Sequence, residues 1–263
     1  MSSLPYVDSI KCCFSELSGN STEYIPNFIE VYFVETKILD SWFSCLKNYI
    51  SEDEQIIANN FYSDIYRKTY LSCHALLRLM LAEKLNMNPL DLSIIRGINN
   101  KPVLSCNHAY FNLSHTRDAF AFVIARDFHV GIDLEKVRQI LNIHPIMDNF
   151  FNFTEREYIL DEEVDTFNRF FLLWTRKEAF LKALGTGLIE NLNQIIVSEP
   201  INLLRKELFD NLGEDFFLNE YYLYSYNISN HVITIATAGK SSISFYNLNE
   251  ENIYQLALET FQS

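Results

Sequence analysis

The stretch from Val130 to Glu135 constrains the fold of this chain more than any other. Apolar residues alternate in it with a glycine and two acidic residues, which is the period of a half-buried β-strand. Side chains two positions apart share a face, roughly 6.5–7 Å from each other, so Asp133 and Glu135 point the same way. Two carboxylates on a rigid element can bind a hard cation such as Mg²⁺. An exposed strand face without a metal shows the same pattern. Other parts of the chain must therefore distinguish a metal site from an exposed face.

The composition indicates a folded protein that does not bind nucleic acid in general. Of the 263 residues, 48% are hydrophobic and 14% are aromatic, and a chain of this length can bury one large core or two modest ones. The net charge of −13 argues against a nucleic-acid binder, which carries a basic surface. An anionic substrate is still compatible with this charge, because a local basic cluster with a metal reverses the sign inside one cleft.

The cysteines and the lack of targeting signals predict a cytoplasmic protein without a membrane partner. The N-terminus has no basic start followed by an apolar core, and no apolar run approaches the ~20 residues that span a bilayer. The cysteines form no C-x-x-C pair, which argues against a disulfide framework or a zinc site and favours a reducing compartment. They are Cys12, Cys13, Cys45, Cys73 and Cys106.

The hydrophobic pattern predicts an α+β fold with two similar halves. In the first half we expect a strand at 29–34, a capping box at 51–54, a helix at 64–84, and strands at 92–95, 110–115 and 120–125. After a polar link at 126–129 the pattern begins again, with a strand at 130–135, a capping box at 154–157, a helix at 164–184, strands at 195–198, 222–226, 232–237 and 243–246, and a helix at 250–261. We therefore divide the chain into residues 1–127 and residues 128–263.

The helix predicted at 164–184 carries an acidic residue on an apolar face. Trp174 and Leu181 belong to one apolar stripe, and at ~100° per residue Glu178 falls near the centre of that stripe. A carboxylate among aromatic side chains is costly unless it is paired or coordinated. Lys182, one turn later, reaches the same place. Two interpretations stay open: a structural Glu178–Lys182 ion pair, or a share in a metal site.

Several familiar catalytic motifs are absent. The sequence has no H-E-x-x-H, G-x-G-x-x-G, G-x-x-x-x-G-K or G-x-S-x-G. Ser114 and His115 are adjacent on a predicted strand and point to opposite faces, so they do not form a nucleophile–base pair. What remains is typical of Mg²⁺-assisted handling of a polyphosphate. The carboxylates are Asp133, Glu135 and Glu178. The candidate hydrogen-bond donors to a phosphate are Lys101, Ser114, His115 and Lys182.

The order and wording of these motifs resemble those of the 4′-phosphopantetheinyl transferases, in particular the long, surfactin-synthetase-activating type. The resemblance spans residues 100–188 and is thinner before residue 64 and after residue 198. It is carried by Asn100-Lys101-Pro102, by Phe111-Asn112-Leu113-Ser114-His115-Thr116, by the stretch from Gly131 to Lys136, and by the stretch from Trp174 to Leu188.

This resemblance implies an enzyme that transfers 4′-phosphopantetheine from coenzyme A to a serine of an acyl or peptidyl carrier protein and releases 3′,5′-ADP. Asp133, Glu135 and Glu178 would hold Mg²⁺, or Mn²⁺ in its place, on the coenzyme A pyrophosphate. Glu178 would also be the base for the serine hydroxyl. Lys182 would neutralise the pyrophosphate and help the leaving phosphate.

The resemblance also implies the contacts to coenzyme A and the overall architecture. Ser114 and His115 would contact its phosphates and Lys101 its nucleotide, with the loosely aligned Arg67 and Lys68 nearby. The chain would be a monomer built as a pseudo-dimer. Each half would be a small, mainly antiparallel sheet packed with a long helix, and the active cleft would lie between the halves. A local patch with Lys136 and Arg138 would receive the carrier protein.

Two other functions remain open from the sequence. A non-catalytic homologue would bind coenzyme A or a carrier protein without turnover. An unrelated Mg²⁺ phosphohydrolase or nuclease would use the same acidic cluster.

Overall fold

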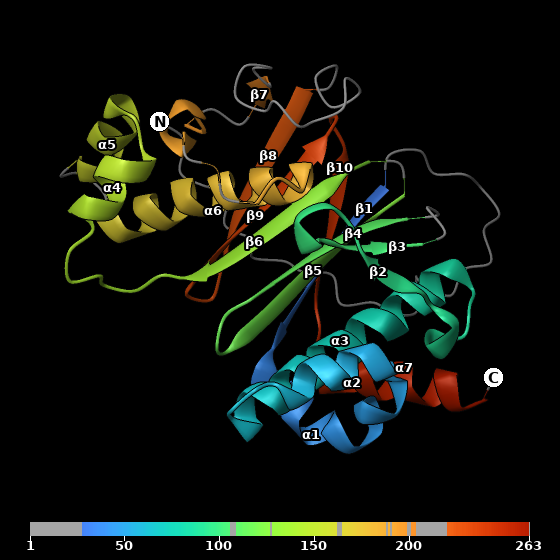
Figure 1. Cartoon of the computed structure of the whole chain (residues 1–263). Helices are drawn as coiled ribbons and strands as arrows, with labels where there is room; N and C mark the ends of the chain where they lie inside the picture. The colour runs from blue at the N-terminus through green and yellow to red at the C-terminus, as the bar shows by residue number, and fades with distance from the viewer. Residues whose placement is uncertain are drawn as a thin grey trace.

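The computed structural model describes residues 28–105, 109–126, 128–161, 165–187, 189, 191–198, 201–203 and 220–262. In this part of the chain, helices pack against two four-stranded sheets, and a separate two-stranded ribbon lies beside β4 of the first sheet (Figure 1). The predicted α+β class is therefore confirmed. Cys45 and Cys73 are free thiols, while Cys12, Cys13 and Cys106 lie outside the described residues.

The first sheet has the strand order β10-β1-β5-β4. At its centre, β1 (Phe28–Glu35) pairs antiparallel with β5 (Ala119–Ala125) and parallel with β10 (Ser242–Asn247). β4 (Tyr110–His115) forms the other edge beside β5. Every residue of β5 is buried, as the continuous apolar run of its sequence predicts for a strand covered on both faces.

Four helices gather on one face of the first sheet; three of them contribute to its core, and α2 packs on α3 (Figure 1). They are α1 (Thr36–Leu46), α2 (Glu52–Asn59), α3 (Asp64–Leu85) and α7 (Glu250–Gln262). The helices at the two ends of the described chain lie side by side, with the rings of Trp42 on α1 and Tyr254 on α7 5.7 Å apart. The division of the chain at residues 127 and 128 stays a prediction. The strand pairing adds that β10 and α7 lie with the N-terminal elements.

The second sheet is antiparallel and has the order β6-β9-β8-β7. Its strands are β6 (Val130–Lys136), β9 (His231–Ala238), β8 (Glu220–Ile228) and β7 (Ile201–Leu203). The long helix α6 (Thr166–Leu184) lies across β6 and β9, with α4 (His144–Phe150) and α5 (Phe153–Leu160) beside its first turns (Figure 1).

Gly131 lets α6 lie directly against β6. A Cβ atom at this position would lie 2.1 Å from the carbonyl oxygen of Ala179 and 2.3 Å from the amide nitrogen of Ala183. Both of these are backbone atoms of α6, which cannot rotate away as a side chain can. Only glycine therefore fits at this crossing.

The two sheets meet at the edges of β4 and β6, and side chains join them. The amide of Ile132 donates to Oδ1 of Asn112 at 3.0 Å, and the amide of Leu134 donates to Oγ of Ser114 at 3.2 Å. These side chains take the place of a neighbouring backbone for the outward amides of β6. On the opposite faces, both sheets contribute to one apolar cluster, which includes Val130, Ile132 and Leu134. The predicted alternation of faces in β6 is confirmed, but residues 130–134 are all buried, so the strand is covered on both faces and is not half-buried as predicted.

Most of the predicted elements are confirmed, including the capping box at 51–54 and the helix at 64–84. The strand predicted at 92–95 is shifted, because β2 (Ile94–Arg96) pairs with β3 (Pro102–Leu104). Short 3-10 helices fill several connections: η2 (Lys47–Tyr49), η3 (Pro89–Asp91), η4 (Ile98–Asn100) and η5 (Leu192–Gln194). Val164, the predicted start of the helix at 164–184, lies outside the described residues, and Asp165 caps α6.

Two local predictions are wrong. The second capping box starts at Asn152, whose Oδ1 accepts from the Glu155 amide at 2.8 Å, so α5 begins before the predicted Thr154. Asparagine caps a helix as well as threonine does. Residues 195–198 form no strand, because side chains satisfy their backbone: Arg176 donates to the Val197 carbonyl at 2.9 Å, and Glu155 accepts from the Val197 amide at 2.9 Å.

Candidate active site

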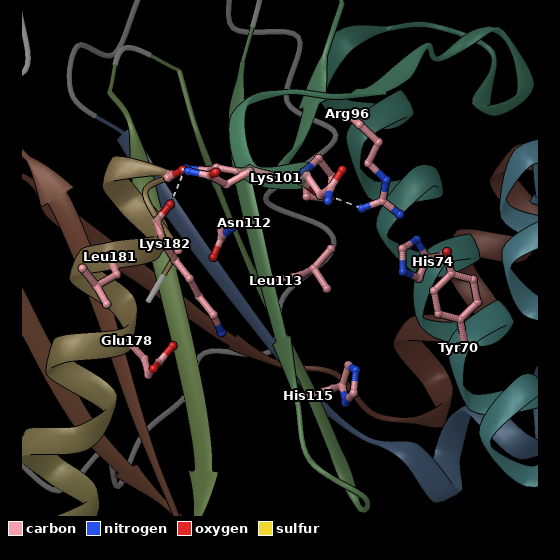
Figure 2. A pocket seen from close by; sticks show the side chains of 15 residues that line it. Tyr70, His74, Arg96, Lys101, Asn112, Leu113, His115, Glu178, Leu181 and Lys182 are labelled. Atoms are coloured by element: carbon pink, nitrogen blue, oxygen red, sulfur yellow. Dashed lines mark hydrogen bonds between the residues drawn. The ribbon is translucent and has the colours of Figure 1, made fainter. Parts of the chain in front are cut away.

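A cavity of about 370 Å³ opens between α3, which packs on the first sheet, and α6, which packs on the second. Its volume is that of a small-molecule site. Figure 2 shows Glu178 and Lys182 projecting from α6, His115 from β4, and Tyr70 and His74 from α3 on the other wall. The remaining lining residues are Arg96, Asn99, Asn100, Lys101, Pro102, Asn112, Leu113, Leu181, Gly185 and Gly187. Both halves of the chain therefore contribute to this cavity.

Asp133 does not line the cavity itself but contacts Lys182, which does, and it is held at only one of its two oxygens. It projects from the face of β6 that meets α6, and it is 5% exposed. Its Oδ1 accepts from Nζ of Lys182 at 2.7 Å and from Oγ of Ser114 at 3.0 Å. Its Oδ2 is buried and has no hydrogen-bond partner among the described residues. A buried carboxylate oxygen without a partner is costly, and a bound cation would satisfy it.

The charges of Asp133, Glu135 and Glu178 act on one another. Burial raises the pKa of Glu135, and the neighbouring Asp133 raises it further. Burial and then Asp133 also raise the pKa of Glu178, while Lys182 lowers it. Like charges held together favour protonation unless a cation neutralises them.

Among the described residues, no group of three His, Cys, Asp or Glu side chains is already arranged around a metal position. Metal binding by Asp133, Glu135 and Glu178 therefore stays a prediction. The residues present fit a hard divalent cation, since all three offer oxygen ligands and one buried oxygen of Asp133 has no partner in the part of the chain that the structure describes.

Lys182 forms its ion pair with a residue of β6, the strand on which α6 packs, and not with a residue of its own helix. Its Nζ lies 2.7 Å from Oδ1 of Asp133 and 3.1 Å from Oγ of Ser114. The purely structural Glu178–Lys182 pair does not occur among the ion pairs of the described residues. The physical reason is that Asp133 offers a more buried carboxylate to the same ammonium. Glu178 is left facing the cavity.

Ser114 and His115 point to opposite faces of β4, as predicted. Ser114 is buried, and its hydroxyl is fully used: it donates to Asp133 and accepts from Lys182 and from the Leu134 amide. His115 is exposed to the cavity, and burial, then Lys182, lowers its pKa. His115 can thus meet a ligand directly, whereas Ser114 organises the groups around it. Their contacts to a coenzyme stay predictions.

The three other basic residues predicted at the nucleotide are each engaged elsewhere. Lys101 lines the cavity, but its ammonium donates to backbone carbonyls. Arg67 pairs with Asp64 at 2.9 Å, and the ammonium of Lys68 lies 5.7 Å from the centre of the Phe43 ring. Neither Arg67 nor Lys68 lines this cavity. Nucleotide contact by these residues is untested.

Comparison with known proteins places the chain in a family. A family model described as the 4′-phosphopantetheinyl transferase superfamily matches residues 129–236. The 4′-phosphopantetheinyl transferase HetI of Nostoc sp. is 32% identical over 167 residues, which cover 59% of this chain and 68% of that protein. The chain belongs to the 4′-phosphopantetheinyl transferase superfamily. The predicted family and enzyme class are therefore confirmed.

Other 4′-phosphopantetheinyl transferases are similar over comparable lengths. The 4′-phosphopantetheinyl transferase gsp of Aneurinibacillus migulanus is 29% identical over 203 residues, 69% of this chain and 82% of that protein. The 4′-phosphopantetheinyl transferase ffp of Bacillus subtilis is 28% identical over 145 residues, 54% of this chain and 63% of that protein. Membership of this superfamily removes the alternative of an unrelated phosphohydrolase or nuclease. In the described part of this transferase, no helix is long and apolar enough to cross a membrane.

Sequence reasoning missed the α3 wall of the transferase cavity. His74 lies against the ring of Tyr70, with centroids 4.0 Å apart, and its Nδ1 lies 3.4 Å from Oε1 of Glu54 on α2. Arg78 of α3 donates to the same carboxylate at 3.2 Å. His74 fits the apolar period of its helix and reads as a core residue. Only the tertiary packing that brings α3 opposite β4 and α6 reveals that His74 faces a cavity.

Proposed function

We propose that this chain catalyses the Mg²⁺-dependent transfer of 4′-phosphopantetheine from coenzyme A to a serine of an acyl or peptidyl carrier protein, with release of 3′,5′-ADP. The observation that carries this proposal is Oδ2 of Asp133, which has no partner among the described residues, together with the contact of Asp133 to Lys182, which lines the cavity with Glu178. Membership of the superfamily and the names of the relatives support the group that is transferred.

Asp133, Glu135 and Glu178 are the proposed metal ligands. A bound Mg²⁺, or Mn²⁺ in its place, supplies charge neutralisation to the pyrophosphate and orients it. The raised pKa values of Glu135 and Glu178 support one shared site, because the same like charges that raise them would stabilise a divalent cation. Asp133 is already held by Ser114 and Lys182, so its free oxygen has a fixed position.

Glu178 is the proposed base. It faces the cavity, is half-buried, and accepts no hydrogen bond among the described side chains. The serine oxygen forms a bond to the phosphorus that carries pantetheine, and the serine proton passes to Glu178 directly or through one water. The bond from that phosphorus to the bridging oxygen breaks, and the electron pair stays on 3′,5′-ADP. Phosphoryl transfer of this kind needs alignment and charge neutralisation more than covalent help from the protein.

Lys182 is the proposed donor to the pyrophosphate. Its ammonium lies beside Asp133 at the floor of the cavity and is about one-third exposed, so it can meet a phosphate oxygen while it stays near its carboxylate. Losing one such preorganised donor costs about 10²–10³-fold in rate in other enzymes. His115 is the proposed second phosphate contact, and Ser114 supports both Lys182 and Asp133. Arg67 and Lys68 complete the proposed contacts to coenzyme A, and the family resemblance adds Lys101, whose ammonium donates to backbone carbonyls.

The architecture and the partner belong to the same proposal. We propose a cytoplasmic monomer of the long type, with two pseudo-symmetric halves divided at residues 127 and 128. The match to the gsp protein, which covers 82% of that protein and 69% of this chain, supports the long type. Lys136 and Arg138 are proposed to receive the carrier protein. They leave β6 beside Glu135, which Arg138 contacts at 3.3 Å, and Lys136 pairs with Asp118.

One assay tests the proposed reaction. The protein is incubated with an apo carrier protein, coenzyme A and Mg²⁺, and intact-mass spectrometry follows the carrier. A mass gain equal to phosphopantetheine, with matching formation of 3′,5′-ADP, is the expected result. An unchanged carrier in the presence of bound coenzyme A would leave the non-catalytic alternative. Parallel samples with a chelator, and with Mn²⁺ added back, test the metal.

A further inference from the structure

The C-terminal end of α6 lies against the loop that carries Lys101. A helix leaves its last four carbonyls without intrahelical partners. At the end of α6, Gly185 adopts a left-handed φ of 74°, and its amide donates to the Leu181 carbonyl at 2.8 Å. The carbonyls of Lys182 and Ala183 are left for donors from outside the helix.

Lys101 supplies those donors. Its Nζ lies 2.5 Å from the carbonyl oxygen of Lys182, 3.2 Å from that of Ala183 and 3.1 Å from that of Val130. Figure 2 shows the side chain reaching from its loop to the backbone of Lys182. An ammonium has three N–H donors, and here each has one carbonyl acceptor. The lysine has no donor left for a phosphate without releasing part of the backbone.

The neighbouring Asn99 extends the same contact. Its Nδ2 lies 2.8 Å from the carbonyl oxygen of Gly185 and 2.8 Å from that of Thr186. Asn99 and Asn100 hold left-handed φ values of 51° and 62°, which asparagine tolerates better than most residues. The Asn-Asn-Lys sequence is therefore shaped to follow the end of α6.

The contact is a cap and not an ion pair. No carboxylate within the described residues pairs with Lys101, and burial alone lowers its pKa to about 8. Two carbonyls at the negative end of the α6 dipole and the Val130 carbonyl of β6 compensate the buried ammonium. The backbone carbonyls that the Lys101 ammonium contacts are thus also the groups that stabilise its charge.

We propose that Lys101 is a positioning residue that acts through the backbone of Lys182, in place of the nucleotide contact that the family resemblance implies. The inference rests on the proposed function. It follows from the three carbonyl oxygens that the Lys101 ammonium contacts. Those of Lys182 and Ala183 lie in the last turn of α6, and that of Val130 lies at the start of β6. Lys101 thereby holds α6, which carries Glu178 and Lys182, against β6, which carries Asp133 and Glu135.

The Lys101→Met variant tests this inference, because it keeps the aliphatic stem and removes the ammonium. We expect kcat to fall about 10–100-fold, the cost of a small displacement of a reacting group, while the Kd of coenzyme A, measured by calorimetry, stays within about twofold. Amide hydrogen exchange at Gly185 should become faster. A nucleotide contact predicts the reverse: a weaker Kd, an unchanged kcat and unchanged exchange. That result would overturn the proposal.

A double-mutant cycle with Lys182→Met shows whether Lys101 acts through Lys182. In the Lys182→Met background we expect Lys101→Met to change kcat by less than about twofold, because coupled residues are not additive. If the two substitutions instead lower kcat by factors that multiply in the double variant, the inference would be overturned. If Lys101→Met fails to fold, Asn99→Ala, which removes the second set of cap contacts, should show the same signs at smaller size. Lys37→Met, which removes an exposed ammonium paired with Glu35, is the matched control.

The failure of the inference and that of the proposed function are distinguishable in these samples. Absence of carrier modification by the wild-type protein would overturn the proposed function. Normal modification by the wild type together with multiplying effects, or a weakened coenzyme A affinity in Lys101→Met, would overturn the positioning role alone.

Discussion

Nζ of Lys182 lies 2.7 Å from Oδ1 of Asp133, and the other oxygen of that carboxylate is buried without a partner among the described residues. One lysine therefore neutralises one of the three carboxylates that are proposed as metal ligands. The ammonium stabilises Asp133 when no metal is bound. It also limits how much negative charge a metal would have to neutralise.

Asp133→Asn tests the metal site by binding and not only by turnover. Mg²⁺ should raise the melting temperature of the wild-type protein, because a ligand that binds only the folded state stabilises it. The amide variant should lose most of this rise together with transfer activity. Differential scanning fluorimetry over a Mg²⁺ titration measures the effect. An equal rise in both proteins would remove Asp133 from the set of ligands.

Glu178→Gln should abolish measurable transfer while the fold stays intact. The amide keeps the shape of the side chain but cannot accept the serine proton, and losing a general base costs about 10²–10⁴-fold in rate. Single-turnover mass spectrometry of the carrier gives the rate, and circular dichroism reports the fold. Glu157→Gln, at an exposed position on α5, is the control. Near-normal transfer by the Glu178 variant would exclude this residue as the base.

Glu54 should make the stability of the protein depend on pH in the acid range. Burial alone would raise the pKa of Glu54, but the His74 hydrogen bond, the Ser51 amide and Arg78 lower it from 4.5 to about 2. The contribution is thus fully present above about pH 4.5 and is lost as the pH falls towards about 2, and at 1.36 kcal/mol per pKa unit it amounts to about 3 kcal/mol.

Denaturant unfolding of wild type and Glu54→Gln between pH 2 and pH 7 measures this contribution. The difference in the free energy of unfolding should be largest above pH 4.5 and should shrink towards pH 2. Glu52→Gln, one exposed position in the same helical turn, is the matched control and should show no comparable trend. A difference independent of pH would show that the Glu54 carboxylate contributes through packing and not through its charge.

Gly131→Ala should destabilise the protein by roughly 1–3 kcal/mol or more, because the added methyl group meets the α6 backbone. The new Cβ would lie 2.1 Å from the Ala179 carbonyl oxygen, so α6 must move away from β6. Chemical denaturation measures the loss, and transfer activity should fall with it. Gly187→Asn is the control: no atom lies within 4 Å of a Cβ there, and asparagine tolerates its positive φ. Equal losses in both variants would contradict the close-crossing explanation.

Local patterns predicted the elements that carry the site, because those elements have strong periods. The alternation of β6 placed Asp133 and Glu135 opposite a buried apolar face. The long periodic runs likewise gave α3 and α6 nearly to their ends. Both glycines after α6 adopt positive φ, and Gly185 ends the helix.

Most of what the local patterns do not show depends on contacts between residues that are distant in the sequence. Residues 195–198 have the composition of a strand, yet Arg176 and Glu155 satisfy their polar backbone groups. Lys101 reads as an available basic residue, yet its acceptors are the backbone carbonyls at the end of α6. His74 reads as core, yet its partner Glu54 lies on another helix. No local period encodes which far carbonyl or carboxylate a side chain will meet.

The parallel pairing of β1 with β10 has a consequence for how the polypeptide folds as it leaves the ribosome. The first strand of the described chain emerges before the elements built around α6, but its neighbour at Ser242–Asn247 and the helix that covers the same core emerge after them. The elements built around α6 can therefore assemble while the earlier sheet still has an open edge. The wall of the cavity that carries Tyr70 and His74 rests on that earlier sheet, so the cavity is completed only after β10 and α7 have been made.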